Sequence, residues 1–346
     1  MNPRADPLPD FPANLLDFQR MFPDEAACLR YLERLRWVGG FACERCRAVG
    51  EPFRLATRSR VLKCRFCLHE TSVTAGTVMH RTKTQIHVWF WAAYLVATQT
   101  PGVSALEIQK KLGIRRYETA FQLMHKLRAA MMRPARDRIG SEWPVEMDIT
   151  FVGGKHRSGV QGKTDKTPVI IAVEVRRREV RDRKTDKIVK RALAGRVRLR
   201  KLPNKSAASV DKFVQECVAP GAVINTDDGA EFANLRSLGY AHQPVPMRHD
   251  RVKMDAWLKM VSTVTGNLKT WIDGTFHGVD KQHLQAYLNE FTFRFNRRFY
   301  RPASFRTLLG LGSHQTGPTY RGLYNGDWVH AENPPAARPV NGTQDS

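Results

Sequence analysis

Two short stretches of the sequence end in acidic residues that suit metal-dependent chemistry. Residues 145–154 alternate apolar and polar side chains and close on two glycines, which is the pattern of a strand that runs into a turn. Asp148 lies in mid-strand, where aspartate is disfavoured. A buried aspartate there needs a salt bridge or a metal ion, and a position at the rim of the sheet is the alternative. Residues 222–229 form a second apolar run that ends in Asp227, Asp228 and a glycine. Two strands that each carry an aspartate predict a divalent-metal site for phosphodiester chemistry, and hard oxygen ligands suit Mg²⁺ or Mn²⁺.

Four of the six cysteines form two Cys-x-x-Cys pairs that are separated by 17 residues. They are Cys43, Cys46, Cys64 and Cys67. This spacing predicts a zinc ribbon, in which four thiolates close a structural Zn²⁺ site because no position is left open for chemistry. The basic residues around the pairs are Arg45, Arg47, Arg54, Arg58, Arg60, Lys63 and Arg65. We expect the ribbon to contact DNA, chiefly through Arg45, Arg47 and Arg65; a ribbon that only holds a partner protein is the alternative.

The whole chain is strongly basic. It has 56 Lys and Arg residues against 33 Asp and Glu, a net charge of +23 and a pI of about 10.2. This charge predicts a polyanionic partner, most simply nucleic acid, although a ribosome-like or merely basic surface protein also fits. The sequence has neither a signal peptide nor a run of 18 apolar residues, so we expect a cytoplasmic protein associated with the nucleoid.

The sequence pattern in the middle of the chain predicts helices, two of which are joined by a turn that contains glycine. Residues 84–96 are apolar nearly all round and are expected in the core. Residues 103–114 begin with a capping box from Ser104 to Glu107, and residues 117–128 follow as a second helix. This layout predicts a helix-turn-helix whose second helix enters the major groove, although an ordinary helical hairpin fits as well. The residues expected to contact DNA are Lys110, Lys111, Arg115 and Arg116.

The later part of the chain mixes strand and helix patterns. The expected strands are 145–151, 168–175, 192–200 and 221–227. The expected helices are 206–218, 229–236, 256–272 and 281–297. Three strands, a helix, a strand and more helices is the order of the ribonuclease H-like fold.

The fold class is therefore multidomain α+β, and 346 residues allow two or three domains. The expected segments are an N-terminal helical segment (1–36), the zinc ribbon (37–80), the helix-turn-helix-like module (81–140), the ribonuclease H-like α/β domain (141–305) and a tail (306–346) that is disordered from about 331.

The second and third expected strands are joined by a basic stretch, residues 176–191. Its basic residues are Arg176, Arg177, Arg178, Arg181, Arg183, Lys184, Lys187, Lys190 and Arg191. We expect a long hairpin tip that contacts phosphates, chiefly through Arg176, Arg177 and Arg178. A solvated loop is the alternative.

Several motifs together resemble those of bacterial insertion-sequence transposases. They are the zinc ribbon, VSALEIQKKLG, VEMDITFVGGK, INTDDG, NLKTWIDGTFHG and HLQAYLNEFTFRFNRR. The family is the one numbered fifteen-ninety-five among insertion sequences, with an N-terminal zinc ribbon and a DDE-type catalytic domain. The resemblance implies cutting at the ends of a mobile element and strand transfer into target DNA, with two Mg²⁺ ions, or Mn²⁺, activating water or a 3′-hydroxyl. It also implies double-stranded DNA as the partner and activity as a homodimer or a higher oligomer.

The resemblance also assigns roles to individual residues. Asp148 matches the first metal ligand and Asp227 the second, with Asp228 as a fallback. Lys269 matches a signature lysine that steadies a phosphate, and His277 belongs to the same motif. The remaining motif residues, placed at the DNA or in the C-terminal helix, are Lys155, Glu290, Arg294, Asn296, Arg297 and Arg298. A C-terminal motif that only locks the helix onto the sheet is the alternative.

The third catalytic position departs from the family. It lies seven residues before Lys269 and 35 after Asp227, which is Ser262; family members carry Glu, Asn or His there. A hydroxyl is a poor metal ligand beside a carboxylate. Glu290 is another candidate to complete the site, and Asp255 fills it only if the alignment slips.

Two other functions stay open. A serine at the third position fits a DNA-binding protein that derives from a transposase and has weakened or lost catalysis. A structure-specific nuclease such as a Holliday-junction resolvase shares the metal chemistry, but the ribbon and the helical module favour reading defined end sequences.

Overall fold

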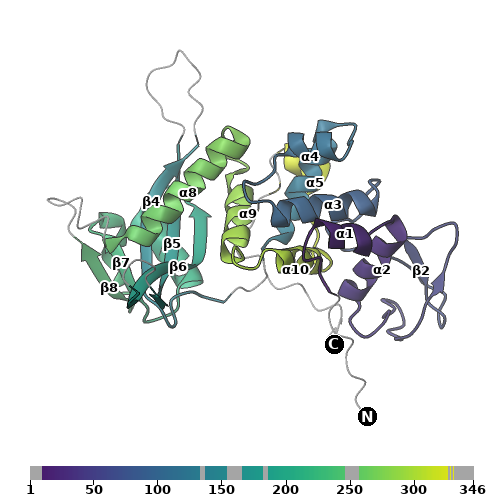
Figure 1. Cartoon of the computed structure of the whole chain (residues 1–346), viewed down its shortest axis with the longest axis horizontal. Coiled ribbons are helices and arrows are strands. Elements are labelled where there is room, and N and C mark those ends of the chain that lie inside the picture. Colours follow the sequence, from purple (N-terminus) through teal and green to yellow (C-terminus); the bar gives the residue numbers. More distant parts are fainter. Residues whose placement is uncertain are drawn as a thin grey trace, which may run out of the picture. The chain divides into compact units, whose positions relative to one another are not determined.

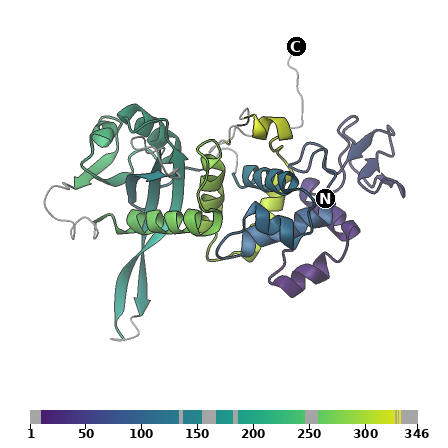
Figure 2. The same cartoon turned by 90° about the horizontal axis from the view of Figure 1, so that it is seen from above.

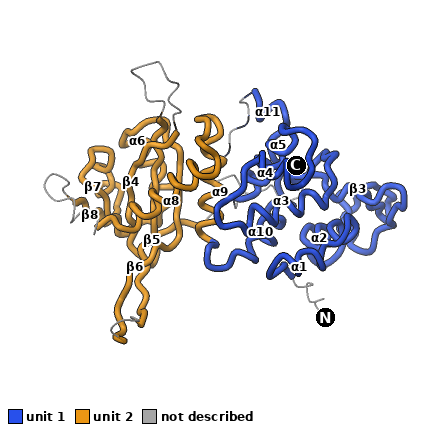
Figure 3. The backbone as a smooth tube through the Cα atoms, turned by 45° about the horizontal axis from the view of Figure 1, so that its top comes forward, with its two compact units in different colours: residues 1–135, 297–346 blue, residues 136–296 orange. Residues whose placement is uncertain are grey.

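The computed structural model of the chain describes residues 10–132, 137–153, 166–181, 186–245, 257–325, 328 and 330. It divides into two compact units, residues 1–135 with 297–346 and residues 136–296 (Figure 3). Three sequence predictions fall outside the described residues: the DNA contact by Lys155, the alternative ligand Asp255 and the disorder of the C-terminal tail. No helix within the described ranges is long and apolar enough to cross a membrane.

The first unit is helical apart from the ribbon. Its helices are α1 (Leu15–Met21), α2 (Glu25–Arg36), α3 (Ile86–Thr98), α4 (Ala105–Lys111), α5 (Tyr117–Ala130), α10 (Pro302–Gly312) and α11 (Tyr320–Tyr324) (Figure 1). The apolar α3 is buried along most of its length, as expected. Phe305 of α10 packs edge-on against Phe18 of α1 and Phe90 of α3, with ring centroids 5.7 and 5.9 Å apart. These aromatic rings form a core rather than faces on which bases could stack.

The ribbon is a three-stranded antiparallel sheet of β1 (Phe53–Arg54), β2 (Val61–Lys63) and β3 (Glu70–Ser72). Leu62 of the middle strand is buried, but strands this short cannot build a sufficient core of their own. Arg36 of α2 holds the ribbon by donating to the carbonyls of Ser72 and Val73 at 2.7 and 2.8 Å.

The second unit is a five-stranded sheet with helices on both faces. Its elements are β4 (Val145–Val152), β5 (Thr167–Arg181), β6 (Ile188–Lys201), α6 (Ala207–Cys217), β7 (Val223–Asp227), the 3-10 helix η1 (Ala230–Leu235), β8 (Ala241–Val245), α8 (Lys259–Phe276) and α9 (Leu284–Asn296). The strand order is β6-β5-β4-β7-β8. The strand β5 runs antiparallel to both of its neighbours, β4 and β6, and β7 and β8 run parallel to β4. The predicted ribonuclease H-like fold is confirmed.

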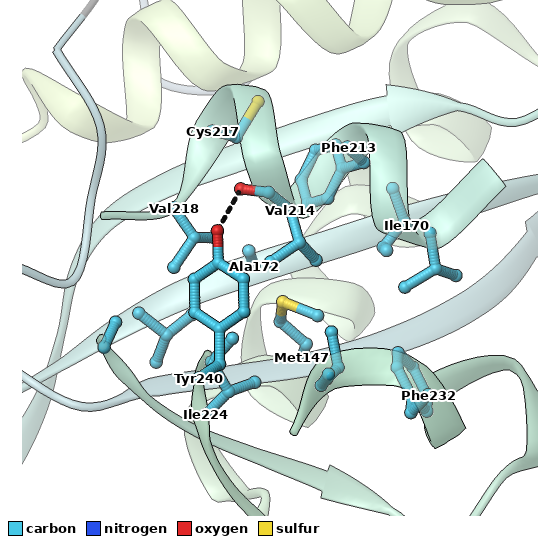
Figure 4. Packing of buried hydrophobic residues seen from close by; sticks show 14 of the residues in the cluster. Met147, Ile170, Ala172, Phe213, Val214, Cys217, Val218, Ile224, Phe232 and Tyr240 are labelled. Carbon is cyan, nitrogen blue, oxygen red and sulfur yellow. Dashed lines mark hydrogen bonds between the residues drawn. The ribbon is translucent and has the colours of Figure 1, made fainter. Parts of the chain in front are cut away.

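Each face of this sheet has its own core. Met147 of β4 joins α6 and η1 in one core (Figure 4), where the Tyr240 hydroxyl donates to the Val214 carbonyl at 3.4 Å. Val152 joins the other core with Val264 of α8 and residues of α9. Because side chains alternate along a strand, the two acidic residues of β4 lie on the face that α8 covers.

The strands β5 and β6 are longer than the sequence indicated, because much of the basic stretch between them is paired. The ladder continues to Arg181 opposite Ile188, and this two-stranded extension leaves the sheet (Figure 2). Its base is a bulge at Glu174, which increases the local twist. Gly195 fits there because a Cβ atom would lie 2.9 Å from the Cβ of Glu174. We call residues 175–181 and 188–194 the basic arm.

Candidate metal centre and nucleic-acid surfaces

The sheet places the two predicted aspartates on neighbouring parallel strands. Val145 of β4 pairs with Ile224 of β7, and Asp148 and Asp227 each follow three residues later. Val145 and Ile224 belong to the core on the α6 side, so both aspartates face the opposite side. Neighbouring strands lie about 4.8 Å apart, and the two carboxylates therefore share one end of the sheet.

Burial and the neighbouring groups have opposite effects on the first aspartate, Asp148. Burial raises the pKa of Asp148, and three features oppose this rise. The Ile149 N–H donates to its Oδ1 at 2.7 Å, and the positive charges of Lys205 and Lys269 favour the ionised form. The structure therefore brings the predicted Lys269 close enough to Asp148 for their charges to interact.

The negative charge of the second aspartate, Asp227, is less well compensated by its neighbours. Burial raises the pKa of Asp227, and the negative charges of Asp148 and Glu231 raise it further. Its Oδ1 atom is buried and has no hydrogen-bond partner among the described residues. Two carboxylates that repel each other, one of them with an unpartnered oxygen, fit a hard divalent cation. Such a cation would neutralise both charges and take that oxygen as a ligand.

Two residues of this centre were not predicted from the sequence. Glu231 of η1 is 8% exposed, and the Lys205 Nζ lies 2.7 Å from its Oε1. The available signal for Glu231 was an acid about one helical turn after Asp227, whereas Lys205 lies in a loop that carries no pattern. Within the described ranges, the four ribbon cysteines are the one group of at least three candidate ligands whose atoms all lie within 4.8 Å. The carboxylates of this centre stand wider apart than that.

The helix α8 carries the predicted third position. Glu146 of β4 fixes its first turn, because Oε2 accepts the N–H groups of Met260 and Val261 at 2.7 and 2.9 Å. Ser262 and Lys269 are exposed and seven residues apart, so they lie on the same side of the helix. The register of the helix leaves a serine hydroxyl, rather than a carboxylate, at the expected position.

The other described candidates for the third position have different surroundings. Glu290 of α9 is 0% exposed, and its Oε1 accepts from Arg294 at 3.3 Å. Asp228 is exposed. Burial and Arg236 lower the pKa of His242 on β8, and the charge of Asp228 opposes this decrease. The charge of Asp228 therefore favours the protonated form of His242.

The C-terminal motif fastens α9 to the edge of the sheet. The Asn296 Oδ1 accepts the Val197 N–H at 2.8 Å, and its Nδ2 donates to the Val197 carbonyl at 3.2 Å. The Gln285 Oε1 accepts the Lys201 N–H at 2.9 Å. These bonds satisfy part of the outer edge of β6, which would otherwise be open to pairing.

Three further predicted DNA contacts lie at or near helix ends. His277 is exposed and ends α8 with a left-handed backbone, φ 55°. Arg297 and Arg298 follow α9 and are half-buried. The Arg298 guanidinium lies 4.3 Å from the centroid of the Phe299 ring.

The ribbon cysteines form a compact cluster. The Sγ atoms of Cys43 and Cys67 are 3.5 Å apart, and those of Cys46 and Cys64 are 3.6 Å apart. Four sulfurs at about 2.3 Å from a zinc ion stand roughly 3.8 Å from one another, so the cluster fits Zn²⁺. The two pairs also make the same turn, because the N–H groups of Arg47 and Leu68, both at positive φ, donate to the carbonyl of the first cysteine of each pair. The predicted zinc ribbon is confirmed.

The basic residues of the ribbon divide into two sets. Ion pairs at 2.8, 2.7 and 2.7 Å join Arg54 to Glu33, Arg58 to Glu70 and Arg60 to Glu25. The predicted DNA contacts Arg45, Arg47 and Arg65 are exposed. The Arg65 guanidinium lies 4.8 Å from the centroid of the Phe53 ring.

The helices α4 and α5 keep their predicted layout. The Ser104 Oγ accepts the Glu107 N–H at 3.1 Å, and Gly113 turns the chain at φ 62°. The exposed residues around this turn are Lys110, Lys111, Arg115 and Arg116. Lys111 also pairs with Glu107 at 2.7 Å.

The basic arm presents its arginines to solvent. Arg177 and Arg178 are exposed, while Arg176 lies 3.3 Å from Glu174. Arg178 stands directly opposite Arg191 in the ladder. Like charges in this position destabilise a strand pair, and a polyanion bound along the arm would relieve the repulsion.

Two family models match the chain. A transposase zinc-ribbon domain matches residues 23–70 and an ISXO2-like transposase domain matches residues 141–296. Comparisons with curated proteins and with solved structures gave no match. The first matched stretch holds the cysteine cluster, and the second holds both strand-borne aspartates within the ribonuclease H-like sheet. The chain therefore belongs to the ISXO2-like transposases, which join a zinc ribbon to a DDE transposase domain.

Proposed function

We propose that the chain is an active DNA transposase that binds the ends of an insertion sequence and catalyses metal-dependent strand cleavage and strand transfer. The observation that carries this proposal is the placement of Asp148 and Asp227 on adjacent parallel strands of a ribonuclease H-like sheet. Their negative charges repel each other, and the buried Oδ1 of Asp227 has no hydrogen-bond partner among the described residues. These surroundings favour a bound cation, and phosphodiester cleavage uses one.

Asp148 and Asp227 would hold Mg²⁺ or Mn²⁺, which supplies the charge that activates the attacking oxygen and stabilises the leaving one. The sheet fixes the spacing of the two carboxylates, and burial keeps competing water away from them. Lys269, which acts on Asp148 from α8, would steady a phosphate of the DNA backbone.

The surfaces expected to bind double-stranded DNA lie outside this centre. The ribbon would use Arg45, Arg47 and Arg65, and α5 would enter the major groove beside the exposed basic residues of the α4–α5 turn. The basic arm would follow the phosphate backbone. In this division of work the first unit reads the element ends and the second performs the chemistry, within a homodimer or larger assembly.

Cleavage and strand transfer on DNA that carries the element's own ends, with Mg²⁺ or Mn²⁺, test the proposal. We expect Asp148→Asn and Asp227→Asn each to lower the cleavage rate by at least about a thousandfold. Asp228→Asn is the matched control, since it makes the same change one residue away on an exposed side chain, and it should retain activity. Full activity in Asp148→Asn would refute the catalytic assignment.

The exposed serine at 262 supports a second candidate, a transposase-derived DNA-binding protein without catalysis. Under this alternative the wild type binds the element ends but does not cut them. Ser262→Glu separates the two cases, because silence in the wild type with cleavage in the variant would mean that a lost third ligand had been restored.

A further inference from the structure

The metal centre has an open third position, and α8 does not supply a carboxylate for it. The Glu146 carboxylate fixes the first turn of α8 by accepting two N–H groups. The Ser262 N–H donates to the Leu258 carbonyl at 3.0 Å in the same turn, so this part of the helix is held in its register. A hydroxyl contributes little to a hard divalent ion beside two carboxylates. A third carboxylate ligand would therefore come from another element.

η1 provides one. Glu231 is 8% exposed although it is a charged residue on a short helix next to the end of β7. Its carboxylate folds back over Gly229, where a Cβ atom would come within 2.8 Å of the carboxyl carbon and of both oxygens. The glycine thus leaves room for a carboxylate beside the loop that follows Asp227.

The contact with Gly229, two residues after Asp227, places the Glu231 carboxylate beside the end of β7. Asp148 lies on the neighbouring strand β4, which runs parallel to β7. Three carboxylates therefore lie at one end of the sheet. Such a group is costly unless cations compensate it.

Lys205 provides part of this compensation. Its Nζ lies 2.7 Å from the Glu231 Oε1, and Glu231, Asp227 and Asp148 all favour its charged form. Its side chain is 43% exposed, so it can turn outward into solvent. Each acidic side chain of the centre would then be able to turn toward one ion.

We propose that Glu231 is the third carboxylate ligand of the metal centre, in place of the absent carboxylate at position 262, and that Lys205 is a built-in counter-ion that a divalent cation displaces. The inference rests on the proposed function, since it completes the same centre. On this basis the chain keeps three acidic ligands, two on strands and one on η1, despite the serine on α8.

The decisive measurement is Mn²⁺ binding to the full-length, zinc-loaded protein without DNA, followed by the electron paramagnetic resonance signal of free Mn²⁺. Thiolate sites retain zinc against the harder Mn²⁺ ion, so the ribbon does not interfere. We expect Glu231→Gln to weaken binding roughly ten- to a hundredfold, at least as much as loss of a residue that only orients a ligand. Glu216→Gln is the matched control, because Glu216 of α6 forms an ion pair with Arg200 of β6 at 2.6 Å, and it should leave binding unchanged.

Lys205→Met separates a ligand from a merely structural partner. If Glu231 only holds Lys205, both variants disturb the same ion pair and weaken Mn²⁺ binding alike, which would overturn the proposal. If Glu231 is a ligand, Lys205→Met keeps or tightens binding because a competing cation is gone. The double variant Lys205→Met with Glu231→Gln removes both charges, so it tests the loss of the ligand in a fold that carries no unpaired lysine.

Asp148→Asn distinguishes failure of the inference from failure of the proposed function. Weak binding in Asp148→Asn with normal binding in Glu231→Gln refutes the role of Glu231 and leaves the two-aspartate centre intact. Unchanged Mn²⁺ binding in Asp148→Asn refutes the centre itself and both proposals with it.

Discussion

At the scale of single residues, the buried carboxylates of the second unit fall into two kinds. Glu174 and Glu146 are satisfied by donors of the chain itself. Asp227 keeps a buried oxygen without such a donor in the part of the chain that the structure describes. A carboxylate with enough donors serves stability, whereas one without them is available to a ligand.

Glu174 should therefore control stability as a function of pH. Burial alone would raise its pKa, but hydrogen bonds from Arg196 and from the Gly140 N–H lower it to about 2. Because the folded-state pKa lies below the unfolded one, the stabilisation is complete above about pH 4.5 and is lost as the pH falls toward 2; it amounts to about 3 kcal/mol.

We expect Glu174→Gln to lower the free energy of unfolding by about this amount at neutral pH, and the gap from the wild type to shrink as the pH falls below about 4.5. Denaturant titrations over this pH range measure it. Glu179→Gln, on the exposed arm, is the control with little change. Parallel pH profiles for the wild type and Glu174→Gln would contradict the assignment.

At the scale of elements, α8 depends on a cap that comes from another strand. Its N-cap residue, Leu258, makes no side-chain capping bond, and Glu146 of β4 supplies the acceptor instead. The cap also places a negative charge at the positive end of the helix dipole. This contact aligns the helix that bears Lys269 with the strand that bears Asp148.

Glu146→Leu should leave two buried N–H groups without an acceptor and destabilise the second unit by about 2 to 4 kcal/mol. Glu146→Gln keeps an acceptor and loses only the charge, so its effect should stay below about 1 kcal/mol. Hydrogen exchange of the Met260 and Val261 amides reports the cap directly. Equal protection of these amides in Glu146→Leu and the wild type would refute this role.

The ribbon is an element whose stability depends on its metal. Chelation of zinc, or Cys67→Ser, should open the ribbon to proteolysis, because metal binding contributes on the order of 10 kcal/mol to such folds. Cys217→Ala, a buried cysteine on α6 outside the cluster, should retain one zinc per chain. Elemental analysis combined with limited proteolysis checks both outcomes, and a chelated ribbon that stays resistant would argue against a structural zinc.

At the scale of the whole molecule, the net charge of +23 makes DNA affinity strongly dependent on salt. Local ion pairs engage some of the cations, such as Arg58 with Glu70. The arm instead carries Arg177 and Arg178 in exposed positions. The arm is therefore where we expect the salt dependence to be concentrated.

Replacing Arg177 and Arg178 by glutamine should reduce the slope of log affinity against log salt by about 1 to 2, independently of DNA sequence. The matched control replaces two exposed cations elsewhere, Arg20 and Lys212, and should change the slope less. Binding titrations at several salt concentrations give both slopes. Equal slopes for the arm variant and the wild type would mean that the arm does not contact phosphates.

The sequence by itself determined the local features of this protein. Cysteine spacing predicted the zinc ribbon, because a tetrahedral site needs two tight turns of fixed length. Alternating and helical patterns predicted the elements in the order of the ribonuclease H-like fold, and they placed Asp148 and Asp227 on strands. The strand ends were less certain, because pairing between β5 and β6 extended both into the basic stretch.

Tertiary structure alone decided which of these residues meet. Glu231 lies in a predicted helix and Lys205 in a loop without a recognisable pattern, and only the packing of η1 and of the loop before α6 brings them to the aspartates. Likewise, the fold supplied the contacts by which Asn296 of the C-terminal motif fastens a helix to a sheet edge. The physical reason is that periodicity reports which face of an element is buried, while a site depends on distances between elements that no local pattern records.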